Sequence, residues 1–116
     1  MHEASLAAQI LETAEEHARE QGAVKVTAIH LVVGGDAGCD AGSLELYFEI
    51  LSEGSLCEGA RLEVEPVVPL LRCNACGKLF ARKPFSFACP EPGCPGEGEP
   101  TEIGREFYIR SIEVIT

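Results

Sequence analysis

The sequence predicts an α+β protein in which two helices cover one face of a small three-stranded sheet, with a four-cysteine lobe inserted between strands. Three observations predict this fold: two amphipathic helical stretches, three β-branched stretches, and a segment rich in cysteine, proline and glycine. The expected domains are residues 1–71 with 106–116 for the helices and sheet, and residues 72–105 for the insertion.

The first helix is predicted over residues 4–21. Its apolar residues recur every four positions and form one stripe: Leu6, Ile10, Ala14 and Ala18. Charged residues occupy the other side, and Gly22 is a plausible end of the helix. His17 falls outside the stripe, so we expect it at the surface.

The first strand is predicted over residues 23–33, which are β-branched and roughly alternating. The alternation slips near Ala28, which indicates either two partly buried faces or a β-bulge. His30 lies among apolar neighbours. We therefore expect an ordinary core or sheet histidine there, rather than a metal ligand.

A glycine-rich loop over residues 34–42 precedes the second helix, for which Ser43 is the expected N-cap. The side of this helix expected to pack inward carries Leu44, Tyr47, Phe48 and Leu51. Gly54 ends the helix. Cys57 is interpreted as a small apolar filler between helix and strand, and Cys39 as an exposed thiol.

The second and third strands are predicted over residues 60–71 and 106–116. Pro66 and Pro69 cannot donate to a β-ladder, so the second half of the earlier strand should lie at an edge or leave the sheet. A two-stranded hairpin is only marginally stable. We therefore expect the last strand to rejoin the other two.

Four of the six cysteines lie in two knuckles separated by twelve residues: CNAC (Cys73 and Cys76) and CPEPGC (Cys89 and Cys94). Their spacing is typical of Zn(II) sites, where thiolates bind tetrahedrally. A thiol-redox pair and two disulfides are the alternatives. The two pairs argue against the first, and a reducing cytoplasm argues against the second.

A structural zinc also explains how such an apolar-poor lobe folds, since metal binding supplies about 10–16 kcal/mol in small zinc modules. Four cysteines fill all ligand positions, which favours a zinc-ribbon-like structural site over catalysis. We expect Phe80, Phe85 and Phe87 to pack around the metal.

The net charge of −10 disfavours nucleic acid as a partner, because phosphate backbones are repelled. No apolar run approaches the length of about 20 residues that a membrane span requires. No secretory signal is recognisable, so a cytoplasmic location is expected.

The chain begins Met-His-Glu, which places an amine, an imidazole and a carboxylate within three residues. Nitrogen donors arranged in a plane favour Ni(II) or Cu(II). Chain termini are usually frayed and without function, so the spacing alone leaves a metal site and a solvated terminus both open.

Four features together resemble the HypA/HybF family of hydrogenase-maturation nickel metallochaperones: MHE, LELYFEILSEGSLCEGARLEVE (44–65), the paired-cysteine lobe and GREFYIRSIEVI (104–115). The resemblance extends along nearly the whole chain. It implies a small α/β domain with a zinc lobe between strands, and a metal-binding protein rather than an enzyme.

The resemblance also implies which residues bind each metal. Ni(II) would be bound chiefly by His2, with the Met1 amine and with Glu3 nearby, and Asp40 could approach it. Structural Zn(II) would be bound by the four cysteines of the two knuckles: Cys73, Cys76, Cys89 and Cys94. The implied partners are a GTPase of the HypB type and a hydrogenase large-subunit precursor, and some members serve urease. A monomer and a homodimer are both compatible with the sequence.

The chain departs from the family at its second knuckle, where CPEPGC replaces the usual CxxC, and this wider loop could alter the zinc geometry. Two other classes of protein remain as alternatives. One is a zinc-ribbon adaptor without nickel transfer, against which the negative charge argues. The other is a thiol oxidoreductase.

Overall fold

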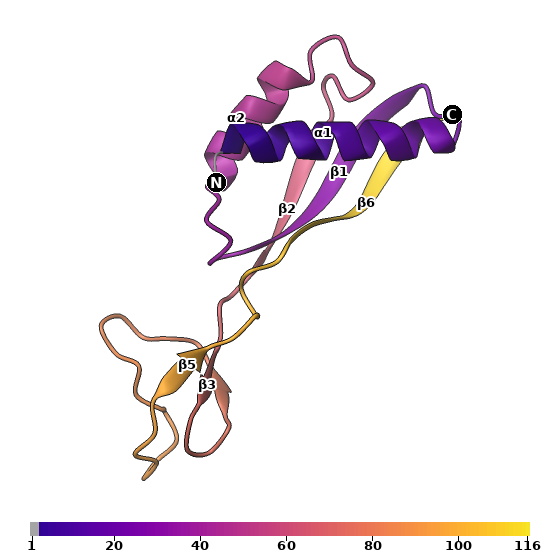
Figure 1. The fold of residues 1–116 in the computed structure, drawn as a ribbon. Coiled ribbons are helices and arrows are strands. Elements are labelled where there is room, and N and C mark those ends of the chain that lie inside the picture. The colour runs from indigo at the N-terminus through magenta and orange to yellow at the C-terminus, as the bar shows by residue number, and fades with distance from the viewer. Residues whose placement is uncertain (1–2) are drawn as a thin grey trace.

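The computed structural model describes residues 3–116, which form two three-stranded sheets and two helices in an elongated molecule of 58 × 24 × 16 Å (Figure 1). In chain order the elements are α1 (Glu3–Glu20), β1 (Lys25–Gly34), α2 (Ala41–Leu51), β2 (Arg61–Val67), β3 (Leu71–Cys73), β4 (Leu79–Phe80), β5 (Gly98–Pro100) and β6 (Phe107–Ile115).

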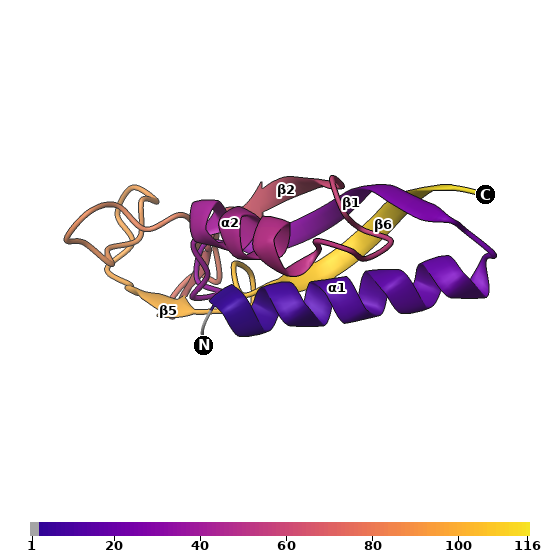
Figure 2. The same cartoon turned by 90° about the horizontal axis from the view of Figure 1, so that it is seen from above.

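The larger sheet has the order β2-β1-β6, with β1 parallel to β2 and antiparallel to β6. Both helices lie on the same face of this sheet (Figures 1 and 2). The predicted α+β fold is confirmed, including the return of the last strand to the first two. The smaller sheet, with the order β4-β3-β5, is built from the segment between β2 and β6.

The main core lies between the helices and the larger sheet. The predicted stripe of α1 is buried there, as are the helix-facing residues of β1 and two residues of α2, Leu44 and Phe48. Burying a large apolar side chain fully stabilises a fold by about 1.5–3 kcal/mol. Cys57 is also fully buried in this cluster, which confirms its expected role as a filler.

The start of α2 differs from the prediction. Asp40, not Ser43, is the N-cap, and its carboxylate accepts a hydrogen bond of 2.9 Å from the Ser43 backbone N–H. The helix consequently begins two residues before the expected cap and presents a narrower apolar face to the core. Tyr47 and Leu51 are each 42% exposed rather than packed inward.

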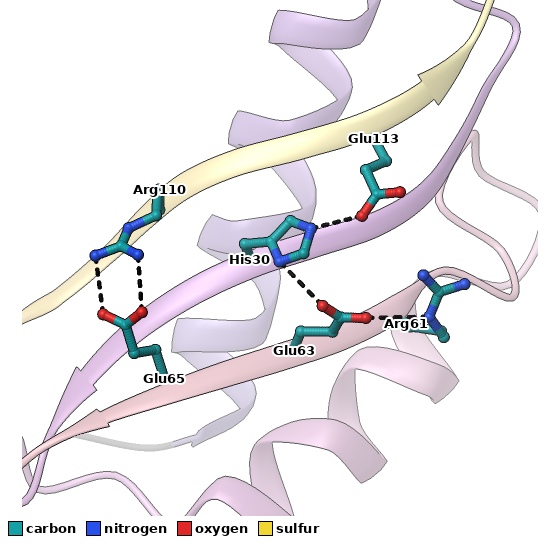
Figure 3. A network of polar contacts seen from close by, with 6 residues as sticks. All are labelled: His30, Arg61, Glu63, Glu65, Arg110 and Glu113. Atoms are coloured by element: carbon teal, nitrogen blue, oxygen red, sulfur yellow. Dashed lines mark hydrogen bonds and ion pairs between the residues drawn. The ribbon is translucent and has the colours of Figure 1, made fainter.

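The slip in alternation within β1 corresponds to irregular pairing with β6. The register shifts between Val26 and Ala28, and again between His30 and Leu31. A bulge turns successive side chains out of strict alternation. Val26 and Ile29 therefore both reach the core, while His30 lies on the opposite, open face (Figure 3).

The chain leaves the larger sheet after β2, as the prolines predict. Pro66 pairs with β1 at the sheet edge, and the next residues run into the smaller sheet. The connection is tight: a side chain on Gly34 would collide with the backbone of Gly104, and one on Gly104 would collide with Pro69. Gly104 also has a φ of 108°, which glycine adopts most readily.

The smaller sheet buries three residues, Leu71, Cys73 and Phe80. The expectation for the other two phenylalanines is wrong. Phe85 is fully exposed and Phe87 is 45% exposed, with the Arg82 guanidinium 5.3 Å from the Phe87 ring centroid. The lobe is too small to enclose all three aromatic rings.

Within residues 3–116, no helix is both long enough and apolar enough to cross a lipid bilayer.

Candidate metal centres

The four cysteines of the inserted lobe converge on one point. The sulfur of Cys73 lies 3.6 Å from that of Cys94, and the sulfur of Cys76 lies 3.7 Å from that of Cys89. A tetrahedron with Zn–S bonds of about 2.3 Å has sulfur–sulfur edges of about 3.8 Å. The sulfur spacing thus fits a single tetrahedral ion, whereas a disulfide would require sulfurs about 2.05 Å apart.

Local backbone geometry shapes the first knuckle. Cys73 ends β3, and the turn after it is closed by a 3.1 Å bond from the Gly77 N–H to the Cys73 carbonyl. Inside this turn, the N–H groups of Ala75 and Cys76 point at the Cys73 sulfur, at 3.3 and 3.5 Å. These bonds orient the sulfur and favour its thiolate form.

The longer second knuckle reaches the same geometry through a turn of its own. The Cys94 N–H donates to the Glu91 carbonyl at 3.1 Å, and the Glu91 carboxylate forms a 2.9 Å ion pair with Lys78 beside the first knuckle. Glycine is needed at Gly96, where a side chain would collide with the Cys73 sulfur. The wider CPEPGC loop therefore keeps the four sulfurs together.

The charges of the cluster call for a cation. The backbone N–H groups of Cys76 and Ala75 lower the pKa of the Cys73 thiol to about 6. The pKa of Cys89 is instead raised to about 12: the Glu91 N–H favours its thiolate, but loss of solvent and the hydrogen bonds with neighbouring sulfurs outweigh that effect. Four adjacent thiolates repel one another, and a divalent ion offsets this repulsion.

The four cysteine sulfurs fit Zn(II) and fill all four positions of its tetrahedral shell, so no position is left for water. All six cysteines of the chain are free thiols, and the other two, Cys39 and Cys57, lie outside the cluster. Burial raises the pKa of Cys57 to about 11, which makes that thiol unreactive. A closed cage of four sulfurs suits a structural ion.

Of the four predicted nickel residues, Met1 and His2 lie outside the described residues. Glu3 begins α1 and Asp40 caps α2. The pKa of the Cys39 thiol is raised first by burial and then by the negative charges of the Glu3 and Asp40 carboxylates.

Glu3 and Asp40 do not by themselves make a compact site. In residues 3–116 the histidine, cysteine and acidic donors form two compact groups, and neither includes Glu3 or Asp40. The Asp40 carboxylate is engaged by the Ser43 N–H, which lowers its pKa. Asp40 serves as the N-cap of α2, and its approach to nickel stays a prediction.

The second compact group is one that the sequence spacing does not reveal: His30, Glu63 and Glu113. These residues come from β1, β2 and β6 and meet on the open face of the larger sheet (Figure 3). Only the pairing register brings them together, because 33 residues separate the first two and 83 separate the first and last. His17 lies on the surface, as expected, 3.6 Å from Glu20.

Comparison with known proteins agrees with this architecture. A family model described as "Hydrogenase/urease nickel incorporation, metallochaperone, hypA" matches residues 1–114. The hydrogenase maturation factor HypA of Caldanaerobacter subterraneus is 38% identical over 98% of this chain and 99% of its own length. That of Chlorobaculum tepidum is 39% identical over the same shares.

A solved structure shares the fold. The solution structure of the Ni metallochaperone HypA from Helicobacter pylori superimposes with a TM-score of 0.66 and 26% identity, covering 99% of this chain and 98% of that one. The match therefore extends through both sheets and both helices. The chain belongs to the HypA family, whose members are metallochaperones and not enzymes.

Proposed function

We propose that the protein binds one Ni(II) ion at its N-terminus and delivers it to a [NiFe]-hydrogenase precursor during maturation. The observation that carries this proposal is the match to the nickel-incorporation family over residues 1–114, a range that includes Met1, His2 and Glu3. In this proposal His2 is the principal ligand, the Met1 amine is a second donor, and Glu3 lies nearby.

The described residues support a site of this kind. Glu3 starts α1 and Asp40 caps α2, and the negative charge of both carboxylates raises the pKa of the Cys39 thiol. A carrier must also release its metal. Donors at a chain end exchange ligands with a partner far more readily than a closed cage does, which makes the four-cysteine cluster unsuited to delivery.

The four-cysteine cluster has a separate role in this proposal. Cys73, Cys76, Cys89 and Cys94 bind one Zn(II) ion, which holds the inserted lobe (residues 72–105) together as a domain. The sulfur spacing and the small apolar content of the lobe support this assignment.

The partners follow from the family. The relatives are named as hydrogenase maturation factors, which supports a HypB-type GTPase and the hydrogenase large-subunit precursor as partners of this chain. None of the six cysteines forms a disulfide, which suits a reducing compartment, so we place the protein in the cytoplasm. The net charge of −10 suits a metal carrier and not a nucleic-acid binder.

Nickel titration of the zinc-loaded, untagged protein tests the proposal. His2→Ala should abolish the tighter nickel-binding event, and one glycine added before Met1 should weaken it because the amine is moved. His17→Ala is the matched control, since His17 is an exposed histidine on α1, and it should change nothing. Equal binding by wild type and His2→Ala would disprove the N-terminal site.

The same titration should depend on pH. A histidine binds metal through its neutral imidazole, so protons compete with nickel as the pH falls below about 6.5. Affinity at the N-terminus should therefore be full above that value and fall below it. An affinity that is constant between pH 7.5 and 5.5 would contradict histidine ligation.

A further inference from the structure

The face of the larger sheet that points away from the helices carries a network of charged side chains (Figure 3). His30 of the central strand lies between Glu63 of β2 and Glu113 of β6. Arg110 of β6 reaches across β1 to Glu65 of β2 through two hydrogen bonds of 2.7 and 2.8 Å. The nickel-carrier proposal uses none of these residues.

Both edges of the His30 ring face a carboxylate. The Nε2 atom lies 2.6 Å from a Glu113 oxygen, and the Nδ1 atom lies 3.1 Å from a Glu63 oxygen. One donor atom from each of the three residues lies within 4.8 Å of the others. Donors around a single ion with bonds of about 2.1 Å are separated by about 3–4 Å, so small side-chain rotations bring these atoms to ligand distance.

The ring can satisfy both carboxylates in two ways. A doubly protonated imidazolium donates one N–H to each, whereas a neutral imidazole donates to only one and leaves its other nitrogen lone pair facing negative oxygen. A metal ion between that nitrogen and a carboxylate removes the conflict. The second carboxylate then accepts the remaining N–H, as is usual for a metal-bound histidine.

The surroundings leave the site open and negatively charged. The side chains of His30, Glu63 and Glu113 are 30%, 47% and 54% exposed, so water can complete a coordination shell. The nearby cations are already paired: Arg110 with Glu65, and Arg61 with the outer oxygen of Glu63 at 3.3 Å. Among the described residues Glu113 therefore has no Arg or Lys partner, and Glu63 shares one of its two oxygens with Arg61.

We infer that His30, Glu63 and Glu113 form a third metal site, which binds a divalent first-row transition-metal ion on the open face of the sheet. The ion is bound by the His30 Nε2 atom and the Glu113 carboxylate, with water completing its shell. Glu63 accepts the Nδ1–H and fixes the ring. The site goes beyond the proposed N-terminal nickel site and lies on the sheet face opposite α1 and α2.

The donor chemistry defines which ions bind. One imidazole nitrogen with carboxylate oxygens suits Ni(II), Co(II) and Zn(II), and affinity should rise from Mn(II) through Co(II) to Ni(II). Mg(II) and Ca(II) prefer oxygen donors alone. A tenfold excess of Mg(II) should therefore leave Ni(II) bound.

Nickel titration of zinc-loaded, full-length His2→Ala protein isolates this site, because the proposed N-terminal site is absent from that variant. A weaker nickel-binding event should remain. His30→Gln and Glu113→Gln should remove it, and Glu63→Gln should weaken it by about tenfold, the usual cost of losing a carboxylate behind a histidine ligand. His17→Gln, at a histidine with one carboxylate nearby, is the matched control.

Paramagnetic NMR on His2→Ala protein, in which the sheet carries no substitution, gives a readout that does not depend on the folding of the sheet variants. Substoichiometric Ni(II) should broaden the resonances of His30 and Glu113 before those of His17. Retention of the weaker event in His30→Gln, broadening that is equal at His17, or displacement by Mg(II) would overturn the inference. None of these results bears on the N-terminal site, which wild-type protein tests separately.

Discussion

The two sheets of this molecule have the same number of strands but are stabilised in different ways. The larger sheet buries a continuous apolar cluster shared by α1, α2 and its own strands, whereas the smaller sheet buries only Leu71, Cys73 and Phe80 among the described residues. The strands of the smaller sheet are two or three residues long. So small a cluster cannot hold a sheet of this size without a further constraint.

The difference indicates where metal and where apolar burial determine stability. Beside the smaller sheet, the four clustered sulfurs connect the two knuckles, a role that an apolar core would otherwise fill. In the larger sheet the thiol of Cys57 serves as one more apolar group. Cysteine therefore has opposite uses within one chain, as a ligand where apolar side chains are few and as a filler where they are many.

The largest expected effect is the loss of the smaller sheet when its metal is removed. Chelation, or the substitution Cys76→Ser, should collapse the NMR dispersion of residues 72–105 while leaving that of α1 and β1 intact, because the larger core does not involve the cluster. Cys39→Ser is the control, since Cys39 lies outside the cluster. Simultaneous loss of both sheets would show that the larger one depends on the metal.

A second prediction concerns the apolar core of the larger sheet. Phe48 is 2% exposed, and Phe48→Ala should lower the free energy of unfolding by about 3–5 kcal/mol through lost burial and a cavity. Bound zinc, measured by elemental analysis, should be unchanged. Leu46→Ala on the same helix, at a position that is 56% exposed, should cost about 0.5 kcal/mol or less. A comparable loss in both variants would contradict the assigned core.

Removal of the α2 cap should have a moderate effect. Asp40→Ala leaves the Ser43 N–H without its acceptor and should lower the melting temperature by roughly 2–5 °C. Because the Ser43 hydrogen bond lowers the Asp40 pKa, the cap contributes fully above the ordinary carboxyl pKa of about 4 and is lost as the pH falls through the lowered value. The difference between wild type and variant should therefore vanish in strong acid.

The smallest expected effect concerns the ion pair on the open face of the larger sheet. A double-mutant cycle with Arg110→Gln and Glu65→Gln should give a coupling energy of about 1 kcal/mol or less, because both side chains are more than half exposed. Urea unfolding at low and at high salt measures this coupling, which salt should reduce. A coupling several times larger would make the pair a major contributor to the sheet.

Much of the fold could be predicted because its signals are local. The stripe of α1 depends on a four-residue repeat, the slip near Ala28 is visible in the order of apolar residues, and Pro66 cannot belong to a central strand. The clustering of the four cysteines also follows from short spacings within two knuckles. Each of these features depends on residues close in the sequence.

Other features could not be predicted, because they depend on which distant residues meet. Phe85 is fully exposed rather than packed around the metal. The choice of Asp40 over Ser43 as the N-cap of α2 is local, but both residue types are favoured caps. No spacing rule connects His30 to a glutamate in each of two other strands.

The sequence by itself determined the helices, the strands and a four-sulfur cluster, since backbone propensity and knuckle spacing act over a few residues. Only the tertiary structure decided that β1 lies between β2 and β6, that His30 faces the open side of the sheet, and that Glu63 and Glu113 meet it there. The physical reason is that strand order and register are set by long-range pairing and burial, which no local pattern encodes.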